Sequence, residues 1–127
     1  MFAKIRSIYH LLIAIFILSV GLSVQPALAH AHLKLQTPAA DSTISPAPNM
    51  LTLSFSEGIE PNFSGVKITG PDRAVVKTGK LSLAANNNKQ INVPLEVELV
   101  AGKYNVSWHV VSVDGHKTKG QYSFTVK

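Results

Sequence analysis

The chain has 127 residues, no cysteine, and 12 lysines and arginines against 7 acidic residues, for a formal net charge of +5. The absence of cysteine excludes disulfides, blue-copper sites and thiolate zinc sites. The basic residues are scattered along the chain rather than clustered, which argues against a nucleic-acid-binding protein.

The first 29 residues have the pattern of a secretory signal peptide. Two basic residues precede an apolar run over residues 11–24, and a small-residue cleavage motif ends at Ala29. The run is short for a membrane span, so we expect cleavage, export to a bacterial periplasm and no membrane-embedded segment in the mature protein. An uncleaved membrane anchor is the alternative. Cleavage would leave residues 30–127 as one small domain with a net charge of +3.

Alternating apolar and polar residues predict an all-β fold for this domain. The candidate strands in chain order are residues 33–36, 51–55, 66–69, 74–77, 81–83, 91–99, 104–110 and 121–126, of which 74–77 and 81–83 have the weakest patterns. Three prolines between residues 37 and 48 predict an irregular crossing, and Pro94 should interrupt the ladder or mark an edge. About seven short strands over this length fit a Greek-key β-barrel or sandwich of the immunoglobulin-like kind.

A candidate metal site combines the new terminus with a turn near the other end of the chain. Cleavage after Ala29 would give His30 two nitrogen donors, the freed α-amine and imidazole Nδ1, that can chelate one ion. Asp114 and His116 are two residues apart, so in an extended backbone their side chains point the same way. Nitrogen and carboxylate donors in a tetragonal array suit Cu(II). The alternative is a solvated terminus and an ordinary Asp-Gly turn.

Several further residues are candidate ligands, so the sequence alone does not determine which atoms would bind the metal ion. A chain beginning His30-Ala31-His32 can also wrap Cu(II) in a square plane, through the amine, two deprotonated backbone amides and the imidazole of His32. Glu57, at the end of a predicted strand, is either a further ligand or a solvated carboxylate. His109 is out of phase with the apolar row and is expected at the surface. Only Met50 remains as a thioether after cleavage, so a dedicated Cu(I) site is not expected.

An ordered string of motifs spans nearly all of residues 30–127. It consists of His30, Pro38-Ala39, Leu53-Ser54-Phe55-Ser56-Glu57, Phe63-Ser64-Gly65, and the segments 101–108, 110–116 and 120–127. Together these motifs resemble the CopC/PcoC family of periplasmic copper-resistance proteins.

The resemblance implies a seven-stranded Greek-key β-barrel that binds one Cu(II) per mature chain. It places the ligands on His30, Asp114 and His116, with Glu57 near the site. Certain members carry a methionine-rich loop for Cu(I), which this chain lacks in the corresponding region between residues 70 and 89. That absence argues against a site that shuttles between two oxidation states.

The leading functional hypothesis is therefore a monomeric, non-catalytic Cu(II)-binding protein of copper homeostasis or resistance. It would sequester copper or deliver it to a CopD-like inner-membrane importer. One alternative is a copper-dependent oxidative enzyme with an N-terminal histidine brace. The small domain leaves little room for a substrate surface, and Asp114 would occupy a position that oxygen needs. A second alternative is an immunoglobulin-like interaction domain that binds no metal.

Overall fold

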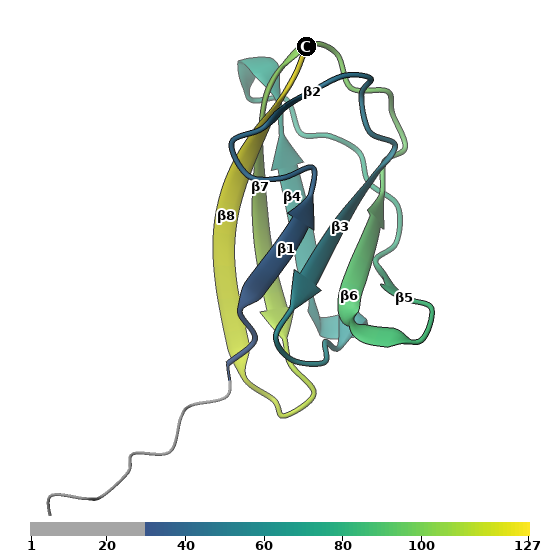
Figure 1. Ribbon diagram of the computed structural model, residues 1–127, viewed down its shortest axis with the longest axis vertical. Coiled ribbons are helices and arrows are strands. Elements are labelled where there is room, and N and C mark those ends of the chain that lie inside the picture. Colours follow the sequence, from purple (N-terminus) through teal and green to yellow (C-terminus); the bar gives the residue numbers. More distant parts are fainter. Residues whose placement is uncertain (1–29) are drawn as a thin grey trace, which may run out of the picture.

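The computed structural model describes residues 30–127, and the predicted signal peptide lies outside the described residues. Two four-stranded sheets lie face to face, one ordered β1-β3-β6-β5 and the other β2-β8-β7-β4 (Figure 1). The elements are β1 (Leu33–Thr37), β2 (Thr43–Ile44), β3 (Met50–Phe55), η1 (Pro61–Phe63), β4 (Gly65–Thr69), η2 (Pro71–Arg73), β5 (Ser82–Ala84), β6 (Asn87–Pro94), β7 (Gly102–Val111) and β8 (Lys117–Val126). The predicted all-β sandwich is thus confirmed.

The described residues form eight strands, close to the predicted number of about seven. The additional strand, β2, lies within the proline-containing crossing and pairs in parallel with the end of β8. Conversely, the segment predicted as a strand at residues 74–77 forms only an isolated bridge between Thr69 and Val75. β2 was missed because two residues of pairing leave no recognisable alternation in a sequence.

Pro94 ends β6, which shortens the strand predicted for residues 91–99. A proline has no N–H to donate, and after it only an isolated bridge between Leu95 and Thr78 continues the pairing. Beyond this point Val97 is 45% exposed, although Leu99 returns to the core. The alternating pattern after Pro94 therefore does not correspond to a paired strand.

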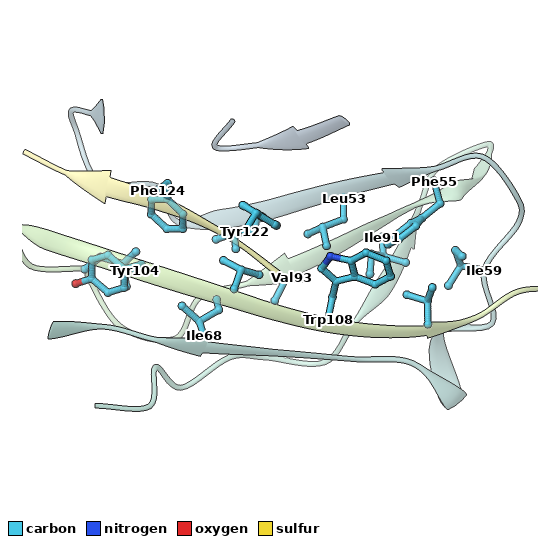
Figure 2. Packing of buried hydrophobic residues seen from close by; sticks show 14 of the residues in the cluster. Leu53, Phe55, Ile59, Ile68, Ile91, Val93, Tyr104, Trp108, Tyr122 and Phe124 are labelled. Carbon is cyan, nitrogen blue, oxygen red and sulfur yellow. The ribbon is translucent and has the colours of Figure 1, made fainter. Parts of the chain in front are cut away.

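The core lies between the two sheets, as Figure 2 shows. Phe55 of β3 meets Trp108 of β7 edge to face, with ring centroids 5.2 Å apart. Tyr104 and Phe124 stack nearer the other end, at 5.5 Å. Burying such aromatic surface from both sheets is the main force holding the sandwich together. The prediction that Tyr104 and Trp108 belong to the core is confirmed.

Strands β7 and β8 pair along ten residues and form the longest hairpin of the domain. The turn of this hairpin, residues 112–116, lies at the same end of the molecule as the beginning of β1 (Figure 1). The C-terminus lies at the opposite end. The fold therefore brings residues near 30 beside residues near 116. Within residues 30–127, no helix is long and apolar enough to cross a membrane.

Candidate metal centre

Hydrogen bonds from two strands fix the segment that precedes β1. Ser56 Oγ accepts a hydrogen bond from the N–H of His32 at 2.8 Å and donates one to the carbonyl of His30 at 3.1 Å. The N–H of Ser56 donates to the carbonyl of His32 at 2.9 Å, and Thr118 Oγ1 donates to the carbonyl of Ala31, also at 2.9 Å. The side chain of Ala31 is only 1% exposed. His30 is therefore attached to the folded sandwich.

The β7–β8 turn is organised by Ser112, a polar residue that is only 1% exposed. Its Oγ donates to a carboxylate oxygen of Asp114 and lies 3.2 Å from the carbonyl of His116, which also accepts from the N–H of Ser112. Gly115 has a φ of +87°, which strains any residue with a Cβ by about 1 kcal/mol or more. The glycine lets the turn present Asp114 and His116 together.

Asp114 and His116 form a close polar pair. His116 Nδ1 lies 2.9 Å from Asp114 Oδ2, and the two side chains are 49% and 39% exposed, respectively. Hydrogen bonds from Ser112 and then from His116 lower the pKa of the Asp114 carboxyl to about 2. The carboxylate is therefore ionised at neutral pH, which is the form that binds metal ions.

The structure brings His30 to this pair. The imidazole rings of His30 and His116 lie edge to face, with centroids 5.1 Å apart and planes at 89°. His30 Nδ1 is buried and has no hydrogen-bond partner within the described part of the chain. Buried polar atoms normally have a partner, and an unpartnered one calls for an explanation such as an ion or water. No group of three histidine or acidic residues at metal-binding spacing occurs among residues 30–127.

The remaining candidates do not form part of this cluster. Glu57 follows Ser56 directly and is half-buried, and it has no ion pair within residues 30–127. The side chain of His32 is exposed beside a surface hollow that Trp108 also lines. His109 is exposed on the outer face of β7, as predicted, opposite Lys119 in the register.

The donor chemistry of the cluster fits copper. Two imidazoles and one carboxylate, with no sulfur, form a set that suits Cu(II). The unpartnered Nδ1 of His30 is the ring atom that would chelate together with a free α-amine.

The sequence matches the model of the CopC domain over residues 33–127. The chain belongs to the CopC family. A relative in *Escherichia coli* strain K12, the protein YobA, is 51% identical over 114 residues, which cover 90% of this chain and 92% of YobA. The crystal structure of PcoC, described as a methionine-rich copper resistance protein from *Escherichia coli*, superposes with a TM-score of 0.71 at 36% identity. It covers 78% of this CopC-family chain and all of PcoC.

A third relative has a different organisation. The copper transport protein CutJ of *Bacillus subtilis* is 29% identical over 98 residues, which are 77% of this chain but only 18% of CutJ. A CopC-like segment thus forms a small part of a much longer copper transport protein. These relatives, YobA apart, are named for copper resistance or transport and not for an enzymatic activity.

The residues that hold the candidate ligands were not foreseen from the sequence. Ser56 and Thr118 fix the segment of His30, and Ser112 orients Asp114. Ser56 lay within a motif used for the family resemblance, but so did Ser54, and alternation alone does not distinguish their roles. Ser112 also lay within such a motif, and its position before an Asp-Gly turn was a further signal, because serine side chains there commonly bond to the local chain.

Proposed function

We propose that the mature protein, beginning at His30, is a periplasmic protein that binds one Cu(II) for copper homeostasis or resistance. The ligands are the α-amine and Nδ1 of His30, a carboxylate oxygen of Asp114 and an imidazole nitrogen of His116. The protein is non-catalytic. It sequesters copper or delivers it to a CopD-like inner-membrane importer.

The observation that carries this proposal is the convergence of His30 and His116. Residues 86 positions apart place their rings 5.1 Å from each other, and the buried Nδ1 of His30 has no hydrogen-bond partner among residues 30–127. Two imidazoles on one ion with metal–nitrogen bonds of about 2.0–2.1 Å come to a comparable separation. Family membership supports copper as the ion, since PcoC is described as a copper resistance protein.

Delivery to a membrane importer rests on the organisation of CutJ. In that relative a CopC-like segment belongs to the same polypeptide as the rest of a copper transport protein. A separate chain with the same fold would bind a copper transport protein as a transient partner, and we propose a CopD-like importer in this role. Glu57, half-buried beside Ser56, is proposed as a residue near the copper rather than as a fourth ligand.

Electron paramagnetic resonance of residues 30–127 with one equivalent of Cu(II) tests the donor set. We expect an axial spectrum with nitrogen couplings from two imidazoles, and loss of the coupling from one of them in His116→Ala. The emission of Trp108, the single tryptophan, provides a parallel titration because it lines the same hollow as Ala31 and His32. A spectrum identical to that of free Cu(II) in the buffer would contradict the proposal.

A further inference from the structure

The terminal sequence His30-Ala31-His32 offers Cu(II) two mutually exclusive arrangements. In one, the ion bridges His30 and the β7–β8 turn. In the other, the terminus alone wraps the ion, through its amine, the deprotonated backbone nitrogens of Ala31 and His32, and the imidazole of His32. The second arrangement needs no folded scaffold, so some feature of the fold has to disfavour it if the first is to form.

We propose that Ser56 is a positioning residue that blocks the wrap by holding the backbone N–H of His32. The inference rests on the proposed Cu(II) site. The hydroxyl of Ser56 accepts that N–H at 2.8 Å, and the same hydroxyl donates to the carbonyl of His30 at 3.1 Å. One side chain therefore fixes a peptide group on each side of Ala31.

The wrap would have to break these contacts before it could form. Its square plane requires the nitrogen of His32 to lose its proton and turn toward the ion, but that N–H points at Ser56 Oγ. It also requires the peptide group between Ala31 and His32 to rotate, although the carbonyl of that group, the carbonyl of Ala31, accepts a hydrogen bond from Thr118 Oγ1. The Ala31 side chain, 1% exposed, would leave the core.

The hydrogen bonds of Ser56 to His30 and His32 also have a consequence for metal selectivity. Square-planar nitrogen sites accept Ni(II) as well as Cu(II). A terminus free to wrap would therefore bind both ions. A terminus held by Ser56 presents only the amine and one imidazole, and it depends on Asp114 and His116 for the remaining donors. We therefore expect the hydrogen bonds of Ser56 to disfavour binding of Ni(II) at the terminus.

The test compares residues 30–127 of the natural sequence with Ser56→Ala and Ser56→Thr. Wild-type protein with one equivalent of Cu(II) should show a mixed nitrogen and oxygen donor set. Ser56→Ala should shift the visible absorption band to shorter wavelength, because deprotonated amides are stronger-field donors, and should release the two amide protons on binding. Ser56→Thr keeps the hydroxyl and should restore the wild-type spectrum. Titration with Ni(II) alone should give a square-planar absorption in Ser56→Ala and none in wild type.

Ser54→Ala is the matched control, since Ser54 is a half-buried serine of β3, two residues before Ser56, and its hydroxyl faces Gln90 at 3.5 Å instead of the terminus. It should leave the spectra and the proton release unchanged. Adding His32→Ala to Ser56→Ala should remove the shifted band. Unchanged spectra and proton release in Ser56→Ala would overturn the role of Ser56 while leaving the copper site in place. A wrap spectrum in the wild-type protein would instead overturn the proposed donor set.

Discussion

The rings of His30 and His116 lie edge to face, 5.1 Å apart between centroids, although the two residues come from opposite ends of the domain sequence. The contact depends on the complete sandwich. His30 is fixed by Ser56 at the end of β3 and, through Ala31, by Thr118 of β8. His116 is fixed by the turn that closes the β7–β8 hairpin. The candidate ligands are therefore brought together by the fold.

A first prediction concerns the α-amine of His30. Adding one residue before His30 converts the amine into an amide, which no longer donates to a metal at neutral pH. We expect the extended protein to bind Cu(II) at least tenfold more weakly than residues 30–127, a loss of about 1.4 kcal/mol. Competition with a chromophoric chelator measures both affinities.

The control for this prediction is an extension at the other terminus. One residue added after Lys127 lies at the opposite end of the molecule and should leave the affinity unchanged (Figure 1). Equal Cu(II) affinity for the N-terminally extended and the natural mature protein would show that the amine is not a ligand. Mass spectrometry of the exported protein should independently give His30 as its first residue.

The sequence predicted the candidate ligands better than it predicted the residues that hold them in position. The spacing of Asp114 and His116 follows from the period of a strand, and the special role of His30 follows from a cleavage motif. By contrast, Ser54 and Ser56 occupy equivalent positions in the alternating pattern, yet only Ser56 meets the terminal segment. The pairing of β1 with β3, including its irregularity near Leu33, decides which of the two serines meets the distant backbone. The sequence of either strand alone does not determine this long-range register.

A second prediction concerns Ser112 and acid stability. Its hydroxyl is the largest cause of the low pKa of Asp114. Since that carboxyl has a lower pKa in the folded protein than its usual 3.8, it contributes stability above about pH 4, and this contribution is lost as the pH falls toward 2. Ser112→Ala should raise the pKa toward 3.8 and make this part of the acid-induced loss of stability shallower.

Carbon NMR of the side-chain carboxyl groups in metal-free protein measures the pKa of Asp114 directly. Asp114→Asn should abolish the titration, which assigns the signal. Ser123→Ala is a suitable control, because Ser123 lies in the middle of β8, away from the turn. A pKa still near 2 in Ser112→Ala would mean that His116 alone holds the carboxylate in its ionised form.

A third prediction concerns the oxidation state of the bound copper. The candidate donors are imidazole nitrogens, an amine and a carboxylate, and Met50, 40% exposed on β3, is the one thioether of residues 30–127. Cu(I) prefers thiolate and thioether ligands, so reduction should release the ion. We expect ascorbate with a Cu(I) chelator to remove copper completely. Met50→Leu should behave like the wild type, and tight retention of Cu(I) by either protein would contradict a single Cu(II) site.

The last prediction separates the folded site from a terminal peptide motif by comparing two histidine substitutions. His116→Ala removes the imidazole that meets His30 and leaves Asp114 without its partner at 2.9 Å. We expect it to weaken Cu(II) binding by at least about 1.4 kcal/mol, or tenfold. His32→Ala should have a much smaller effect, because the side chain of His32 is exposed and its backbone N–H is already held by Ser56.

Both affinities are to be measured at neutral pH against the same competing chelator, with His109→Ala as a surface-histidine control. Circular dichroism of each variant establishes that the sandwich is intact. If His32→Ala were the damaging change and His116→Ala were silent, copper would be bound by the terminal three residues alone, and the roles proposed for Asp114 and His116 would both be wrong.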